Sequence, residues 1–261
     1  MTSPAEKLTS LSGKSLFYHF MAGAHNILEN QKELNRINVF PVPDGDTGTN
    51  LASTIRSIVS NIKPETSYKK QADLIAEAAL VGARGNSGVI FAQFLYGLGN
   101  ETHMENEVSV QSFADSVKKA VDYMYQAIAN PVEGTMITVI REWAEFIHEN
   151  KERLSNFFDL LYESYLKALE SLKDTPKKLE ALAKANVVDA GAKGFVLFLE
   201  GILQWAQSKN LRQIVTFKYD TEIEIDEINN FDHENFTFRY CTEAFVEGTQ
   251  INHKELRQAI E

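Results

Sequence analysis

Residues 38–50, which read NVFPVPDGDTGTN, decide how the rest of this chain is interpreted. Pro41 and Pro43 fix the backbone φ angle and keep the first half of the stretch extended. The stretch then presents two carboxylates, Asp44 and Asp46, one residue apart. Carboxylate oxygens are ligands that Mg²⁺ prefers. The pair is therefore a candidate metal site.

Small residues follow the carboxylates and precede a helical pattern. Gly45 and Gly48 permit tight turns and a close approach of the backbone to a ligand. Thr47, Thr49 and Asn50 are of the types that cap helix starts, where free N–H groups and the helix dipole favour a phosphate. A metal beside a phosphate site indicates binding of a magnesium nucleotide.

Residues 44–48 also have a simpler interpretation. A D-G-D-T-G string is also an ordinary turn followed by a helix cap. The sequence has no G-x-x-x-x-G-K-[ST] phosphate loop. It has no calcium-binding loop beginning at Asp44 either, because Ile55 stands where that loop needs a glutamate. The motif alone therefore leaves both the turn and the nucleotide site open.

Composition limits the class of protein. The chain has 261 residues and a formal net charge of −10, which argues against binding nucleic acid or an anionic lipid surface. Its single cysteine, Cys241, excludes an internal disulfide and is typical of a reducing compartment. We find no signal peptide and no apolar run long enough to span a membrane. We therefore expect a cytoplasmic protein that is not an integral membrane protein.

Apolar residues recur at helical spacing over most of the chain. Breaks at glycine, proline and polar residues separate expected helices at 15–30, 47–61, 68–82, 89–98, 108–129, 135–147, 152–172 and 176–185, with a last long helix after residue 191. We expect residues 1–208 to form an all-α domain, an antiparallel barrel or bundle of about eight helices. Residues 1–12 are polar, and we expect them to be loosely ordered.

The pattern changes after residue 208. Residues 214–217 and 236–246 are typical of strands, residues 219–235 of an acidic linker, and residues 252–260 of the first turns of a helix. Elements this few cannot bury a core of their own. We therefore expect residues 209–261 to be a linker and the beginning of a second, α+β domain, and the chain to be a fragment of a longer protein.

Four breaks between the helices carry small polar residues, at 44–50, 82–88, 133–135 and 189–191. An even number of long helices separates each break from the next, so all four can lie at the same end of an up-and-down bundle. Helix N-termini gathered there would surround one phosphate site. Helix ends need glycine and caps in any protein, so the recurrence alone does not decide between a site and ordinary capping.

Taken together, NVFPVPDGDTGTN, GARGNSGVIFAQFLYG, EGTM and VVDAGAKGF resemble the nucleotide-binding L subunit of dihydroxyacetone kinase. More specifically, they resemble the N-terminal domain of fatty acid kinase A proteins. The resemblance covers nearly all of residues 13–208, and residues 238–243 are similar to the start of that family's middle domain. It implies an all-helical barrel that binds ATP at one rim through two Mg²⁺ ions.

The resemblance also implies roles for individual residues. Relatives hold the metals with three aspartates; Asp44 and Asp46 match two of them, and Asn38 stands near the third with a neutral amide oxygen. Arg84 would supply positive charge to the transferring group, and its alternative role is a salt bridge to a neighbouring helix. Ala190 replaces the proline of the relatives' Asp-Pro-Gly. The implied nucleotide-binding residues are Thr47, Gly48, Thr49, Asn50, Gly85, Asn86, Ser87, Gly88, Thr135, Met136, Asp189 and Gly191.

The implied reaction transfers the γ-phosphoryl group of ATP to the carboxylate of a fatty acid. A carboxylate needs no general base, so catalysis would consist of positioning and charge neutralisation by Mg²⁺. The resemblance also implies a partner, the separate fatty-acid-binding B component, and a homodimer formed through the middle domain. Three alternatives stay open: a dihydroxyacetone-type sugar phosphotransferase subunit, a nucleotide-binding adaptor without catalysis, and a purely structural bundle.

Cys241 has two interpretations. A single cysteine in a strand is commonly a packing residue. With His233 and His253 nearby in the sequence, it is also a candidate ligand for Zn²⁺. The sequence leaves both open.

Overall fold

The structure is a computed structural model that describes residues 8–208, 252, 255, 256 and 259. The strands expected at 214–217 and 236–246, the acidic linker and the zinc hypothesis for Cys241 lie outside these residues. The proposed boundary between two domains at residue 208 stays a prediction.

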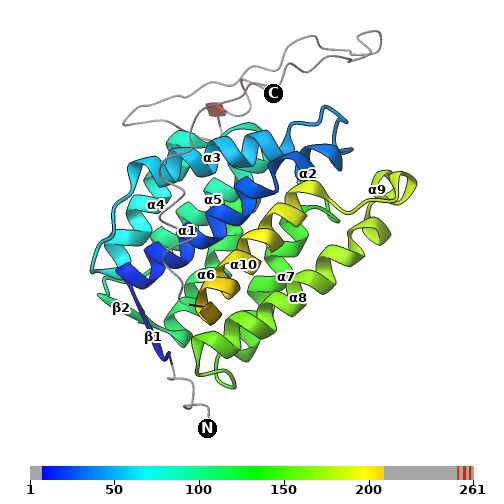
Figure 1. The fold of residues 1–261 in the computed structure, drawn as a ribbon. Helices are drawn as coiled ribbons and strands as arrows, with labels where there is room; N and C mark the ends of the chain where they lie inside the picture. The colour runs from blue at the N-terminus through cyan, green and yellow to red at the C-terminus, as the bar shows by residue number, and fades with distance from the viewer. Residues whose placement is uncertain (1–7, 209–251, 253–254, 257–258, 260–261) are drawn as a thin grey trace. The chain divides into compact units, whose positions relative to one another are not determined.

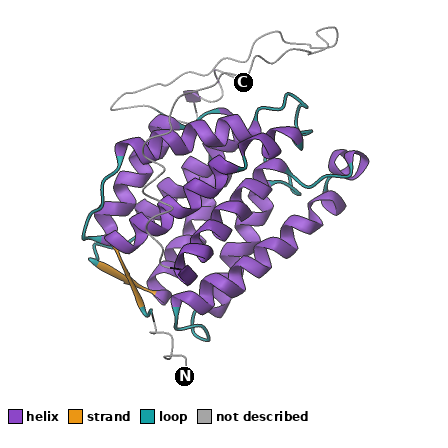
Figure 2. Cartoon of the chain, in the orientation of Figure 1, coloured by secondary structure: helices purple, strands orange, loops and turns teal. Residues whose placement is uncertain are grey.

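Helices make up nearly all of the described part, as Figures 1 and 2 show. This confirms the prediction of an all-α bundle. The helices are α1 (Gly13–Glu29), α2 (Gln31–Arg36), α3 (Thr47–Asn61), α4 (Tyr68–Gly82), α5 (Gly85–Glu101), α6 (Val110–Gln126), α7 (Met136–Asn150), α8 (Phe157–Lys178), α9 (Glu180–Ala185) and α10 (Ala190–Ser208). No helix in the described ranges is long and apolar enough to cross a membrane.

Several helices begin at a serine that caps its own first turn. The hydroxyl of Ser12 accepts the N–H of Ser15 at the start of α1, at 3.3 Å. At the start of α6, the hydroxyl of Ser109 accepts the N–H of Ser112 at 3.2 Å. These bonds satisfy N–H groups that have no partner within the helix. Serine before an apolar periodic run thus sets these helix starts.

Aromatic side chains from α5, α7 and α10 meet in the core. The ring centroids of Trp143 and Phe195 lie 5.3 Å apart, and that of Phe94 lies 6.1 Å from Trp143, all in edge-on contact. All three side chains are buried. Burial of rings this large, with edge-on geometry, is a major source of packing energy. It fixes the relative positions of the three helices, all of which begin at predicted site loops.

The structure corrects two expectations and adds one helix that was not predicted. Residues 10–12 are ordered as strand β1 (Ser10–Ser12), which pairs antiparallel with β2 (Glu107–Ser109) and sets Leu11 opposite Val108. Pro176 does not begin the short helix, because it lies within the last turn of α8, and α9 begins only at Glu180. The sequence also gave no indication of α2, whose six residues are too few to show a helical period.

Candidate functional site

The first two glycine-containing breaks lie against each other. A Cβ atom placed on Gly85 would lie 2.2 Å from Nδ2 of Asn50, and one placed on Gly88 would lie 2.4 Å from Oγ1 of Thr54. The backbone N–H of Arg84 donates to the same Thr54 hydroxyl at 3.2 Å. The start of α5 is therefore packed directly on the first turns of α3.

The other two breaks are also in contact. The buried carboxylate of Asp189 accepts the backbone N–H of Met136 and, through Oδ1 at 2.7 Å, that of Ala192. The second turn of α10 contacts α3, because a Cβ atom on Gly194 would lie 2.5 Å from Cδ1 of Leu51. Figure 1 shows α2, α3 and α10 beside one another. The four breaks thus form two adjoining pairs linked through α3 and α10.

Asparagine amides hold both carboxylates of the first break. Nδ2 of Asn38 donates to Oδ1 of Asp44 at 2.6 Å, and Nδ2 of Asn50 donates to Oδ2 of Asp46 at 2.8 Å. The remaining amide oxygen of Asn38 accepts the hydroxyl of Thr47 at 2.7 Å. Asn38 is only 6% exposed. The loop between the extended stretch and α3 is therefore built around two positioned carboxylates.

The electrostatics of this loop favour a cation. Burial raises the pKa of Asp46, and the nearby carboxylate of Asp44 raises it further, against the opposing hydrogen bond from Asn50. Two like charges this close repel, and a divalent cation between them removes the repulsion. Gly45, at a φ of +66°, supplies the left-handed turn that brings the two aspartates together. Asp44 and Asp46 thus fit a hard divalent ion.

The donor set is small. Within the described part of the chain, no group of three or more His, Cys, Asp or Glu side chains could hold a metal. Both polar atoms of the Asn38 amide already have protein partners, namely Thr47 and Asp44. A metal ion here would have to take its further ligands from other oxygens, such as those of water or of a phosphate group. That is the usual way in which Mg²⁺ binds beside a nucleotide.

The segment after Asp46 is used largely within the protein. A Cβ atom on Gly48 would lie 2.2 Å from the carbonyl oxygen of Gln31, so this glycine makes room for α2. The N–H of Thr49 donates to Oδ1 of Asn35 at 3.0 Å, and Nδ2 of Asn35 donates to Oγ1 of Thr49 at 2.9 Å. Asn35 is not among the residues predicted from the sequence. The only indication in the sequence is its position shortly before the motif, and its helix is too short to be recognised from the sequence.

The residues at the start of α5 remain accessible. Arg84 is exposed, and its Nη1 donates to the carbonyl oxygen of Ala83 at 2.7 Å. Asn86 is exposed and Ser87 is half-buried, whereas Gly88 is buried against α3. A positive φ of +56° at Gly85 lets the chain turn into the helix. This loop can therefore face a ligand while its far end anchors it to α3.

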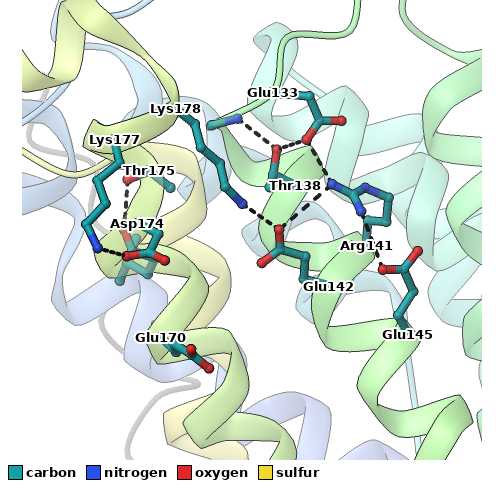
Figure 3. Close-up of polar contacts among 12 residues, drawn as sticks. Glu133, Thr138, Arg141, Glu142, Glu145, Glu170, Asp174, Thr175, Lys177 and Lys178 are labelled. Atoms are coloured by element: carbon teal, nitrogen blue, oxygen red, sulfur yellow. Dashed lines mark hydrogen bonds and ion pairs between the residues drawn. The ribbon is translucent and has the colours of Figure 1, made fainter.

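A polar network fixes the loop before α7, as Figure 3 shows. The N–H of Gly134 donates to Oγ1 of Thr138 at 2.8 Å, and that hydroxyl donates to Oε2 of Glu133 at 2.6 Å. Arg141 also donates to Oε2 of Glu133, at 2.9 Å. Thr135 does not cap α7 with its side chain, because its hydroxyl donates to the carbonyl of Val132 at 2.7 Å.

The same network extends to neighbouring helices. The hydroxyl of Tyr125 on α6 donates to Oε1 of Glu133 at 2.9 Å. Lys178, at the end of α8, pairs with Glu142 of α7. A Cβ atom on Gly134 would lie 2.9 Å from Cβ of Lys178, so the loop is also packed on α8. Three helices thus hold the residues that precede Thr135. No local sequence motif indicated these contacts.

Comparisons with known proteins agree with this arrangement. The family profile of the DAK2 domain matches residues 41–204. An uncharacterized protein of Staphylococcus epidermidis is 34% identical over 245 residues, which are 92% of this chain and 44% of that protein. One of Mycoplasma genitalium is 33% identical over 255 residues, or 94% of this chain and 46% of that protein. The chain thus spans less than half the length of these relatives.

A solved structure shares the fold. The dihydroxyacetone kinase from C. freundii, in complex with AMP-PNP and Mg²⁺, matches with a TM-score of 0.57 and 17% identity. The match covers 78% of this chain and 36% of that one. The family profile covers more than half of the chain and includes all four breaks in full. The chain therefore belongs to the DAK2 domain family.

Proposed function

We propose that this chain binds ATP together with Mg²⁺ at the rim formed by residues 44–50, 85–88, 135–136 and 189–191, as the nucleotide-binding part of a kinase. The observation that carries the proposal is the pair Asp44 and Asp46, each held by an asparagine amide directly before α3. The shared fold with a kinase solved with AMP-PNP and Mg²⁺ supports it.

In this proposal the two aspartates hold the metal, and Mg²⁺ when bound neutralises charge on the phosphate groups. The amides of Asn38 and Asn50 keep the carboxylates in place before the ion arrives. This matters because catalysis of phosphoryl transfer is mainly positioning and electrostatic stabilisation. The exposed guanidinium of Arg84, beside the 85–88 loop, would add positive charge near the transferring group.

We propose the carboxylate of a fatty acid, presented by a separate fatty-acid-binding protein, as the phosphoryl acceptor. A carboxylate oxygen attacks the γ-phosphorus, the bond from that phosphorus to the β,γ-bridging oxygen breaks, and ADP leaves with the electron pair. No proton has to be removed, which fits a site whose acidic groups can serve the metal. The sequence resemblance to fatty acid kinase A proteins supports this choice of acceptor.

The test uses the part of a relative that lies outside the matched region, because this chain spans less than half the length of these relatives. The 261-residue chain replaces the matched region of the S. epidermidis relative, and the chimera is mixed with ATP, Mg²⁺ and a fatty-acid-binding protein loaded with palmitate. Hydroxylamine traps acyl phosphate as a hydroxamate. Hydroxamate from the chimera and none from its Asp46→Asn variant would support the proposal. ATP binding without hydroxamate would contradict the fatty-acid acceptor.

A second acceptor has one observation in its favour. The solved structure that shares this fold is a dihydroxyacetone kinase. The same chimera is therefore assayed with dihydroxyacetone and labelled ATP. Transfer of label to dihydroxyacetone, with none to palmitate, would replace the fatty-acid proposal by the sugar phosphotransferase. Tight ATP binding with transfer to neither compound would favour the adaptor without catalysis.

A further inference from the structure

The start of α3 is capped differently from that of α1, α4 or α6. Serines cap those three helices by accepting an N–H of their own first turn. An aspartate at this position normally does the same. Asp46 occupies the cap position of α3 but makes no such bond. Its carboxylate instead accepts the side-chain amide of Asn50, at 2.8 Å.

Asn35 supplies the missing cap from another helix. Its Oδ1 accepts the N–H of Thr49, the third residue of α3, at 3.0 Å. That is one of the N–H groups that a capping side chain at Asp46 would take. Nδ2 of Asn35 also donates to the hydroxyl of Thr49, at 2.9 Å. Asn35 therefore occupies the place that Asp46 would otherwise use.

Packing holds Asn35 in this position. A Cβ atom on Gly48 would lie 2.7 Å from Oδ1 of Asn35, so only glycine lets α2 approach this closely. Leu34, the preceding residue, is fully buried. Glu33 pairs with Lys193 of α10, which ties α2 to the helix on its other side. The cap is thus part of a fixed helix.

We propose that Asn35 is a positioning residue: by capping α3 in place of Asp46, it keeps the Asp46 carboxylate beside Asp44, where the pair can bind a divalent cation. Without Asn35, the unsatisfied N–H of Thr49 draws the Asp46 carboxylate into the ordinary capping position. This turns the carboxylate away from Asp44. The inference rests on the proposed function, because it assigns a purpose to the metal site described there.

The test compares metal affinity with stability. Binding of Mn²⁺, in the presence of AMP-PNP, is measured by electron paramagnetic resonance on the full chain, and Tm is measured on the same samples. For Asn35→Ala we expect Mn²⁺ affinity to fall by roughly 10–100-fold, the usual effect of losing a residue that orients a metal ligand. Tm should change little, because Asp46 takes over the cap. Asn35→Asp keeps an oxygen acceptor for Thr49 and should retain the wild-type affinity.

Ser109→Ala is the matched control. It removes a cap bond of the same kind at α6 and should lower Tm by roughly 2–4 °C while leaving Mn²⁺ affinity unchanged. Equal Mn²⁺ affinity in wild type and Asn35→Ala would overturn the inference and leave the proposed function standing. A loss of Tm in Asn35→Ala as large as in Ser109→Ala, without a loss of affinity, would also overturn it. No Mn²⁺ binding by the folded wild type would instead overturn the proposed function itself.

Discussion

Asp189 and Met136 join the starts of two helices that are far apart in the sequence. The carboxylate of Asp189, directly before α10, accepts the backbone N–H of Met136, the first residue of α7. The side chain of Asp189 is almost fully buried. The sequence resemblance implies that both residues belong to the nucleotide site. In the structure, Asp189 holds the two loops of that site together.

The stability of the protein should depend on pH because of this buried acid. Burial raises the pKa of Asp189 to about 6. A raised folded-state pKa means that the favourable contribution is present below the unfolded pKa and is lost as pH rises through the folded one. We expect the free energy of unfolding of Asp189→Asn, which does not ionise at this position, to rise relative to that of wild type by about 2.5 kcal/mol between about pH 4 and about pH 7. Urea unfolding of both proteins at the two pH values measures this. A difference that is independent of pH would refute it.

Gly45 and Gly48 should respond differently to alanine. A Cβ atom on Gly45 would meet only the carbonyl of Asn35, at 3.7 Å, so its cost is the left-handed φ, about 1 kcal/mol. A Cβ atom on Gly48 would collide with the carbonyl of Gln31 at 2.2 Å and force α2 away, at a cost of about 3 kcal/mol. Chemical denaturation of the two variants gives both free energies. Equal losses would mean that α2 does not depend on Gly48 for its position.

The pair Glu133 and Arg141 should be coupled. It is partly shielded and shares hydrogen bonds with Tyr125 and Thr138, so we expect a coupling of about 1 kcal/mol in a double-mutant cycle of Glu133→Gln and Arg141→Met. The surface pair Arg153 and Glu163, which shares no hydrogen bond with a tyrosine or threonine, is the control and should show a weaker coupling. Equal coupling in the two cycles would show that the network in Figure 3 adds nothing to the pair.

Much of the fold follows from local patterns. Apolar periodicity located long helices such as α6 because a half-buried helix repeats its apolar face every turn. The motif around Asp44 and Asp46 located the carboxylate loop because its proline and glycine residues have specific backbone requirements. Pro176 misled the prediction, since a helix can contain a proline where tertiary packing compensates for the lost bond.

The contacts that hold the site together could not be predicted in this way. Asn35 caps α3 from a helix of six residues, too short to show a period. Arg141 reaches Glu133 across the start of α7, and β1 pairs with a strand almost a hundred residues away in the sequence. Each of these depends on where the chain returns in space. A single sequence contains no local pattern that indicates these long-range contacts.

Calorimetric titration of ATP into this chain, with Mg²⁺ and again with EDTA, tests the central claim most directly. Wild type and Asp46→Ala are compared, with circular dichroism confirming that both retain their helices. We predict binding by wild type that requires Mg²⁺ and is lost in the variant, because Asp46 is one of only two carboxylates in the loop. Binding that is unchanged by EDTA or by Asp46→Ala, or no binding by a folded wild type, would contradict a metal-dependent nucleotide site at this loop.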